Sequence, residues 1–104
     1  MDIVETIIKQ RASEYGPYVR MCTLAQDLKR IIKHSPSNQD RLIKDHQRES
    51  LDLIATKLAR LLNGDPGHID SWRDIAGYAQ LVVTEEEKGV PACATVRTSS
   101  LNIG

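Results

Sequence analysis

Aliphatic residues recur every three or four positions in four separate segments of the chain, which is the spacing of an amphipathic α-helix. Short stretches rich in glycine, proline and polar residues separate these segments. Because short turns join neighbouring antiparallel helices, we expect an all-α fold, a compact antiparallel bundle of about four helices. The expected helices cover residues 1–12, 17–34, 39–62 and 69–87.

The breaks between the expected helices carry boundary signals. Gly16 interrupts the first pattern, and the proline that follows it suits the first turn of the next helix. In the loop after the second helix, Ser37 or Asn38 can cap the start of the long third helix. Gly64, which follows an asparagine and precedes Pro66, is typical of a helix C-terminus.

The composition indicates one globular domain with an aliphatic core. The 104 residues are 40% hydrophobic and 27% charged, and they include no phenylalanine. Acidic and basic residues number 14 each, so no net charge attracts nucleic acid or a membrane surface. We expect a helical domain over residues 1–88 and an irregular tail over residues 89–104, which is either an extended arm or disordered.

Nothing in the sequence indicates export or insertion into a membrane. No apolar run approaches the roughly 20 residues that span a bilayer, and the N-terminal residues lack a signal-peptide pattern. Cys22 and Cys93 fit a reduced compartment and are not paired with histidines at zinc-site spacing. We therefore expect a cytoplasmic protein that has no membrane partner.

The third segment carries two stripes along neighbouring sides of the expected helix. One is the expected core face and contains Ile43, Ser50, Ile54, Leu58 and Leu61. The other is mostly polar and contains His46, Glu49, Leu53, Lys57 and Arg60. Ordinary solvated helix faces have the same spacing, so each polar residue taken alone also fits a plain surface role.

The fourth segment is divided in a similar way. Its expected apolar side contains Trp72, Ile75, Ala76, Ala79, Val82 and Val83. Its other side contains Asp70, Asp74, Gly77, Tyr78 and Leu81. A glycine inside a helix costs about 1 kcal/mol relative to alanine, so Gly77 indicates the close approach of another backbone or a ligand.

Opposite charges flank the turn between these two segments. Lys57 and Arg60 lie about one helical turn apart and can hold an anion, the lysine as a point charge and the arginine as a fork. Asp70 and Asp74 follow the turn, and Tyr78 lies one helical turn further on. Two interpretations stay open: these residues bind a charged small molecule, or the basic and acidic pairs bind each other as a helix–helix clasp.

Acidic residues on the same two segments form a candidate metal site. Glu49, Asp52 and Asp74 are the candidate ligands, because carboxylates paired across a helical bundle hold Mg²⁺ next to phosphates. Asp70 is a fourth acid on these segments, but Asp52 lies roughly 60° around the helix from Glu49, so a single site that uses all four acids is strained. Mg²⁺ is expected as a cofactor only if the protein is hydrolytic.

A second candidate cluster lies at the first helix break. Tyr15 and Gly16 precede a helix N-terminus, where free backbone N–H groups can meet an anion. Arg11 is close in sequence and could reinforce that interaction. The alternative interpretation is a plain turn that connects two helices.

The stretches "RASEYG" and "KLARLLNGDPGHIDSWRDIAGYAQLV" resemble small phage-encoded helical proteins grouped near the nucleotide-modification-associated domains. The resemblance covers about residues 3–85, and it implies an association with phage nucleotide metabolism and a location in the host cytoplasm. Three elements carry it: Arg-x-x-x-Tyr-Gly, Lys-Leu-x-Arg, and Asp-x-x-x-Asp-x-x-x-Tyr. The matching residues are Arg11, Tyr15, Gly16, Lys57, Leu58, Arg60, Asp70, Trp72, Asp74, Gly77 and Tyr78.

A more distant similarity is to the all-α nucleoside triphosphate pyrophosphohydrolases of the MazG type. Those proteins carry Glu-x-x-Glu on one helix and Glu-x-x-Asp on the next, and these acids coordinate Mg²⁺. Here the corresponding pairs are Glu49-x-x-Asp52 and Asp70-x-x-x-Asp74. The second spacing departs from the pattern, because Ser71 stands where an acid is expected before Asp74.

The function expected from these features is capture of a phosphorylated nucleotide, which could sequester a host anti-phage immune signal. The alternative functions are a MazG-like, Mg²⁺-dependent pyrophosphohydrolase and a structural module in which the charged corner is only a clasp. A homo-oligomer is also expected, because the sides of the helices with Leu53 and Leu81 need further partners. The expected ligand-binding residues are Arg11, Tyr15, Gly16, His46, Lys57, Arg60, Asp70, Asp74 and Tyr78.

Overall fold

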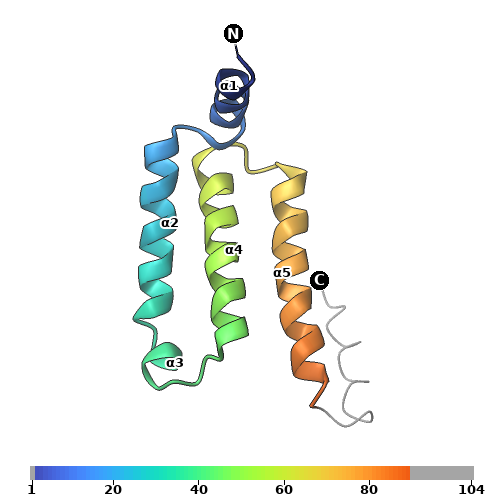
Figure 1. The fold of residues 1–104 in the computed structure, drawn as a ribbon. Helices are drawn as coiled ribbons and strands as arrows, with labels where there is room; N and C mark the ends of the chain where they lie inside the picture. The colour runs from blue at the N-terminus through green and yellow to red at the C-terminus, as the bar shows by residue number, and fades with distance from the viewer. Residues whose placement is uncertain (1, 90–104) are drawn as a thin grey trace.

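The computed structural model describes residues 2–89, which form five α-helices (Figure 1). No strand occurs in this part of the chain, so the all-α prediction is confirmed. None of the helices described is both long and apolar enough to cross a membrane. The helices are α1 (Ile3–Tyr15), α2 (Tyr18–Lys33), α3 (Pro36–Gln39), α4 (Asp45–Asn63) and α5 (Ile69–Glu87).

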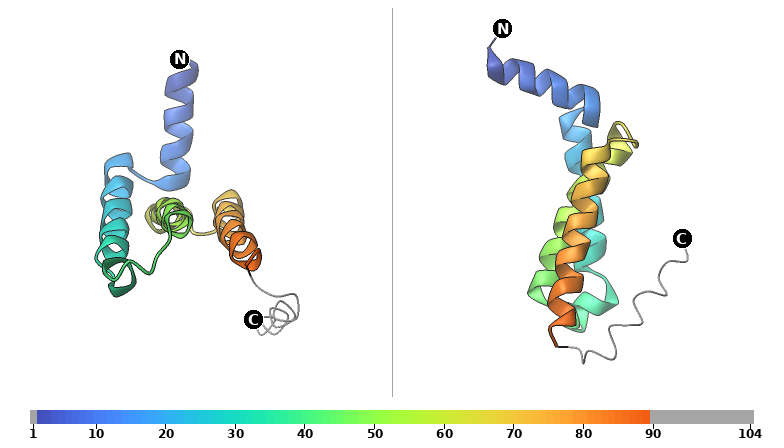
Figure 2. Two further views of the ribbon diagram at one scale, coloured as in Figure 1. Left: turned by 60° about the horizontal axis from the view of Figure 1, so that its bottom comes forward. Right: turned by 90° about the vertical axis from the view of Figure 1, so that its right-hand side faces the viewer.

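The three long helices α2, α4 and α5 lie side by side in one layer, and neighbouring helices run antiparallel (Figure 1). The central helix α4 packs against α2 on one side and α5 on the other. The short helix α3 lies at one end of the layer, and α1 projects from the other end (Figure 2). The expectation of a compact four-helix bundle is therefore wrong in one respect: α1 has no buried residue and does not lie alongside the others.

The core of the layer is small and rich in alanine. Ala25 of α2 and Ala59 of α4 are buried with Met21, and Ala55 and Leu61 are buried elsewhere on α4. Small side chains let two helices approach closely, but they remove little apolar area from water. Of the expected core stripe, Ser50 and Leu61 are buried and Ile54 and Leu58 are half-buried on α4, whereas Ile43 is half-buried in the connection before α4.

The third expected helix begins at Asp45 and not at residue 39, and a short helix lies in the loop that was expected before it. The short helix α3 ends at Gln39, Arg41 adopts a positive φ of 58°, and α4 begins only at Asp45. Ser37 and Asn38 were the expected caps of the long helix, but they lie within α3, and the N-cap of α4 is Lys44. The loop after α2 instead starts α3, where the Ser35 hydroxyl accepts a hydrogen bond from the backbone N–H of Asn38.

The other expected helix boundaries are close to the observed ones. The fourth helix spans Ile69–Glu87, as predicted, and the second is shorter by one residue at each end. The first helix continues three residues further than expected, to Tyr15, and ends at Gly16. The expected tail falls almost wholly in residues 90–104, which lie outside the described residues.

Two backbone turns contact each other tightly where α1 joins the layer, and we call residues 14–17 and 63–65 the glycine joint. The side-chain amide of Asn63 donates to the carbonyl oxygens of Tyr15 (2.8 Å) and Pro17 (3.0 Å). The Asp65 N–H donates to the Glu14 carbonyl at 2.8 Å. These bonds fix the start of α2 and the end of α1 against the C-terminal end of α4.

Both glycines of the joint leave no room for a side chain. Gly16 has a φ of 78°, and a β-carbon there would lie 2.1 Å from the Asn63 carbonyl oxygen. A β-carbon at Gly64 would lie 2.2 Å from the Glu14 carbonyl oxygen. Only glycine therefore allows the two turns to approach to this distance.

The close approach expected at Gly77 is not found. A β-carbon at Gly77 would have no atom within 4 Å outside its own helix, so this glycine faces open space. Gly77 therefore destabilises α5 relative to an alanine at this position, and no close contact with another element compensates for this loss.

A matched pair of glycine-to-alanine substitutions tests the joint. We expect Gly16→Ala to destabilise the protein by about 2 kcal/mol or more, because it adds backbone strain and a steric clash. Such a loss lowers the melting temperature by roughly 10 °C in a domain of this size. Gly77→Ala should instead stabilise the helix by about 1 kcal/mol. Thermal unfolding followed by circular dichroism measures both, and equal effects of the two substitutions would contradict this account of the joint.

Candidate functional site

A pocket lies in the angle between α1 and the layer, and we call it the elbow pocket. Its volume is about 470 Å³. The glycine joint creates it, because the joint directs α1 away from the layer instead of along it (Figure 2). The lining residues come from α1, α2, α4 and the turn between α1 and α2: Ile8, Arg11, Ala12, Tyr15, Gly16, Tyr18, Met21 and Arg60.

Four residues expected at a ligand site lie together in this pocket, although they are far apart in the sequence. Arg11, Tyr15 and Gly16 come from the first helix break, and Arg60 comes from the C-terminal part of α4. The sequence placed them in two separate clusters. The glycine joint brings those clusters to one site.

Arg60 is the most unusual residue of the pocket. Its guanidinium carbon lies 4.9 Å from the centre of the Tyr15 ring, which is the distance of a cation–π contact. Its Nε is buried and has no hydrogen-bond partner. No acidic side chain within residues 2–89 lies at ion-pair distance from Arg60 or from Arg11. A buried N–H donor of a charged group destabilises the fold when no acceptor is near it, so an anion bound at this site would be stabilising.

Tyr15 is held from two directions. Arg60 lies over its ring, and the imidazole of His68 meets the ring edge-on, with 5.3 Å between the ring centres. His68 is fixed in turn by Ser71 Oγ, 3.0 Å from its Nδ1, and by a Glu14 carboxylate oxygen, 3.4 Å from its Nε2. The chain Ser71–His68–Glu14 has the order of a hydrolase triad. Ser71 is only 2% exposed, however, so its hydroxyl cannot reach a substrate. These three side chains instead connect α5 to α1.

Four lining residues of the pocket are not among the ligand-binding residues expected from the sequence: Ile8, Ala12, Tyr18 and Met21. The most informative of them is Tyr18, whose ring is largely exposed beside the pocket. Hydrogen bonding with the neighbouring Cys22 thiol raises the pKa of the Tyr18 hydroxyl above its ordinary value. An exposed tyrosine two residues after Gly16 was a usable signal, because Arg11 and Tyr15 lie in the same stretch.

The second expected cation, Lys57, is bound by an acid. Its ammonium lies 2.9 Å from a carboxylate oxygen of Asp74, and the pair joins α4 to α5. The Lys57 side chain is mostly buried. Hydrogen bonding to the Lys57 ammonium lowers the pKa of the Asp74 carboxyl. For these two residues the structure therefore contains the helix–helix clasp that the sequence left open as an alternative.

Asp70 and Tyr78 do not complete a site at this corner. Asp70 is exposed and lies 3.4 Å from the Arg73 guanidinium, one turn along the same helix. Tyr78 is half-buried on α5 and does not line the elbow pocket.

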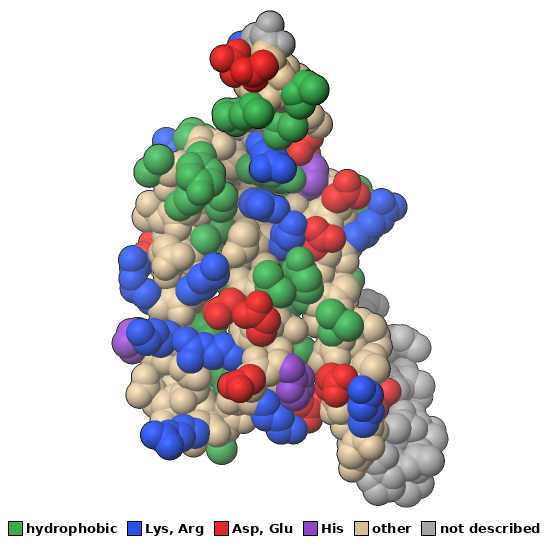
Figure 3. Space-filling view, in the orientation of Figure 1, with side chains coloured by type: hydrophobic (Ala, Val, Ile, Leu, Met, Phe, Trp, Pro, Cys, Tyr) green, Lys and Arg blue, Asp and Glu red, His purple; other side chains and the backbone are tan. Residues whose placement is uncertain are grey.

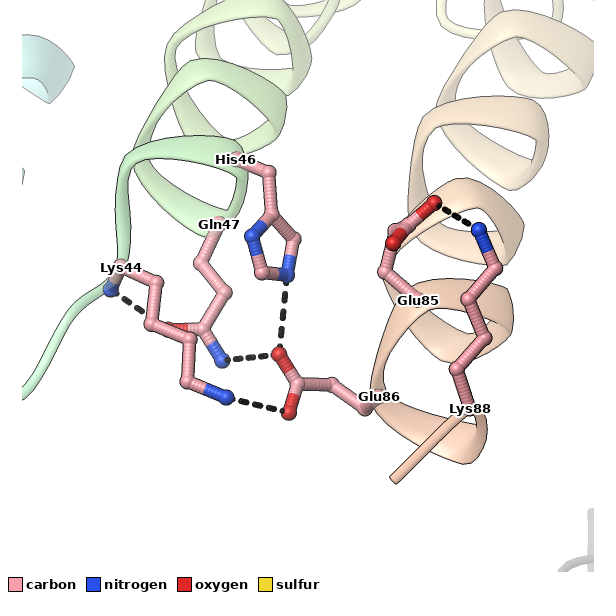
Figure 4. Close-up of polar contacts among 6 residues, drawn as sticks. All are labelled: Lys44, His46, Gln47, Glu85, Glu86 and Lys88. Carbon is pink, nitrogen blue, oxygen red and sulfur yellow. Dashed lines mark hydrogen bonds and ion pairs between the residues drawn. The ribbon is translucent and has the colours of Figure 1, made fainter. Parts of the chain in front are cut away.

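His46 lies at the far end of the layer. It belongs to a group that binds one carboxylate of α5, which we call the Glu86 clamp (Figure 4). Glu86 receives the Lys44 ammonium at 2.8 Å, the His46 Nε2 at 2.8 Å and the Gln47 amide at 3.2 Å. Hydrogen bonds from Lys44 and His46 lower the pKa of Glu86. His46 is 14 residues from Arg60 on α4, which is about 21 Å along the helix axis.

The candidate metal ligands are not gathered. Within residues 2–89 no group of three or more histidine, cysteine or acidic side chains could hold a metal ion. Glu49 is exposed and Asp52 is half-buried on α4, whereas Asp74 lies on α5 and binds Lys57. Acidic and basic side chains are interspersed over the face of the layer that Figure 3 shows.

Residues 1–85 match the model of a family described as a domain of unknown function, DUF6378. The chain belongs to this family. No curated protein and no solved structure matches it. The matched region of this DUF6378 protein includes the whole lining of the elbow pocket and most of α5. Because the family has no assigned activity, its function has to be argued from the site.

The Lys57–Asp74 pair makes a prediction about acid stability. The folded-state pKa of Asp74 is below its ordinary value, so the pair stabilises the fold above about pH 4 and loses this contribution as the pH falls further. Asp74→Asn should therefore lower the melting temperature at pH 7 and show a smaller further loss between pH 5 and pH 3 than the original protein. Melting temperatures measured across this range test the expectation.

Asp70→Asn is the matched control for that measurement. Asp70 is exposed and its ion pair lies within a single helix, so the substitution should change the melting temperature little at pH 7. If both substitutions have the same effect, the clasp does not stabilise the fold.

Proposed function

We propose that the elbow pocket binds a phosphorylated nucleotide, with Arg60 and Arg11 on the phosphates and Tyr18 against the base. The observation that carries this proposal is the buried Arg60 Nε, which has no hydrogen-bond partner. A guanidinium presents donors in a planar fork that matches phosphate oxygens in two-point contacts. An anion in the pocket would bind the remaining guanidinium N–H groups of Arg60, which have no acidic partner within ion-pair distance among residues 2–89.

The rest of the pocket supports a ligand that has an apolar, planar part. Its volume of about 470 Å³ lies within the range of about 300–1,000 Å³ for small-molecule sites. The lining between the two arginines consists of aliphatic side chains, methionine and two tyrosines. Tyr18 offers an exposed ring beside the pocket, and stacking of a base on an aromatic ring contributes about 1–3 kcal/mol.

The lining favours capture of the nucleotide over its hydrolysis. No carboxylate is among the residues that line the pocket, and the acids that resemble the MazG-type ligands lie elsewhere on α4 and α5. A protein that holds a nucleotide without cleaving it could sequester a host immune signal, as the resemblance to phage-encoded proteins suggested. If the protein hydrolyses a nucleotide in the presence of Mg²⁺, the alternative function, a MazG-like pyrophosphohydrolase, is correct instead.

Isothermal titration tests the proposal with ATP, ADP-ribose and inorganic pyrophosphate as probes. We expect at least one nucleotide to bind more tightly than pyrophosphate, because only a nucleotide also uses Tyr18. Arg60→Ala should weaken that binding about 10- to 100-fold, the effect of losing a hydrogen bond to a charged group. Arg11→Ala, at an exposed position, should weaken it without affecting the fold. Arg73→Ala, which removes an exposed arginine outside the pocket, is the control and should leave the affinity unchanged.

The fate of the ligand separates the alternatives. Each probe is incubated with the protein and Mg²⁺, and the mixture is then heat-denatured and analysed by mass spectrometry. An intact nucleotide supports capture, whereas release of pyrophosphate or monophosphate would indicate a hydrolase. If no probe binds with a Kd below about 1 mM, or if Arg73→Ala weakens binding as much as Arg60→Ala, the proposed site is wrong.

A further inference from the structure

The helical layer has two faces of opposite character. The face shown in Figure 3 carries many charged side chains over α2, α4 and α5, and we call it the charged face. Arg60 lines the elbow pocket together with α1 on this side, and helical geometry places the rest of the polar stripe of α4, which includes Glu49, Leu53 and Lys57, on the same side. The helix α1 also projects toward this side (Figure 2).

Helical geometry places large apolar side chains on the opposite side, which we call the apolar face. On α4, Leu51 and Leu53 point about 160° apart, so Leu51 belongs to the face away from the polar stripe. Leu58 and Leu62 follow Leu51 on the same side of the helix, at spacings of seven and eleven residues. On α5, Trp72, Ala79 and Val83 lie on this side, about 180° from Asp74 and Leu81.

An open apolar groove of about 510 Å³ runs along the apolar face between α4 and α5. Its lining contains no charged residue, and its floor includes the buried Ser50. Residues from α3, from the connection before α4, from α4 and from α5 form it: Ser37, Leu42, Ile43, Gln47, Ser50, Leu51, Ile54, Ala79 and Val82.

The apolar face exposes as much area as a stable interface requires. Seven large hydrophobic side chains on or beside it are each between 37% and 69% exposed: Ile31, Leu42, Leu51, Leu62, Ile69, Trp72 and Val83. Together they present on the order of 800 Å² to solvent, which is about the area that each partner buries in a standard protein–protein interface. Monomeric proteins rarely leave an apolar patch of this size uncovered.

We propose that a second copy of this chain covers the apolar face, so that two helical layers pack face to face. Domains normally consist of at least two packed layers, and each copy supplies only one. Leu51, Ile54, Leu58 and Leu62 recur on the central helix at spacings of three or four residues, which forms an apolar seam that can pack against another helix. Across a two-fold axis that seam is complementary to itself.

This interface differs from the one expected from the sequence. The sides with Leu53 and Leu81 were expected to be covered, but they lie on the charged face beside the Lys57–Asp74 pair. Packing on the apolar face leaves the charged face accessible, and α1 projects toward that accessible side (Figure 2). The inference therefore does not depend on what the pocket binds.

Sedimentation equilibrium of the full chain at 1–100 µM tests the proposal. We expect a species of twice the chain mass of 11.6 kDa. Leu62→Glu should raise the dimer dissociation constant at least about 100-fold, because it places two unpaired carboxylates in an apolar interface. Leu51→Glu should act in the same direction. Both positions are partly exposed in the single chain, so circular dichroism should show that the variants remain helical.

Leu81→Glu is the matched control, because Leu81 is as exposed as Leu62 but lies on the charged face. It should leave the dissociation constant unchanged. A monomer at 100 µM would overturn the proposal, and it would mean that the tail or a different protein covers the apolar face. Dissociation by Leu81→Glu, with no effect of Leu62→Glu, would also overturn it and would place the interface on the opposite face.

Discussion

The contact between two backbone turns at the glycine joint sets the geometry on which the site depends. Gly16 and Gly64 let the end of α1 approach the end of α4 closely enough for Asn63 and Asp65 to donate to carbonyl oxygens of residues 14, 15 and 17. Since α1 has no buried residue, these polar contacts, and not a hydrophobic core, determine its direction. The elbow pocket is the space that this direction leaves between α1 and the layer.

The charged residues of the layer divide into those that are paired and those that are not. Lys57 with Asp74 near one end, and the Glu86 clamp at the other, fasten α5 to α4 where the core itself is thin. Arg60, about one turn from Lys57, lies over the Tyr15 ring and has no acidic partner within ion-pair distance among residues 2–89. Lys57 and Arg60 belong to the same stripe of α4 but have different roles. Asp74 forms an ion pair with Lys57 and lies beyond ion-pair distance from Arg60.

Local sequence signals predicted the helices well and the assembly of the site poorly. The fourth helix was predicted to the residue, because its apolar period is continuous and stretches with glycine and proline flank it. The break before α4 was missed, because the apolar spacing continues through Ile43 while the backbone turns at Arg41. Gly77 was expected to mark a close approach, but that role belongs to Gly16 and Gly64, whose contacts join residues about 48 positions apart. Such contacts depend on how helices are placed, which no local pattern records.

The joint also sets when, during synthesis, the pocket can exist. Its hydrogen bonds connect residues 14–17, near the start of the chain, to residues 63–65, near the end of α4. A nascent chain that has not yet emerged through Asp65 contains Arg11, Tyr15 and Tyr18 but has nothing to hold α1 at its angle. The elbow pocket is thus a product of long-range closure, and it forms only after most of the helical layer has been made.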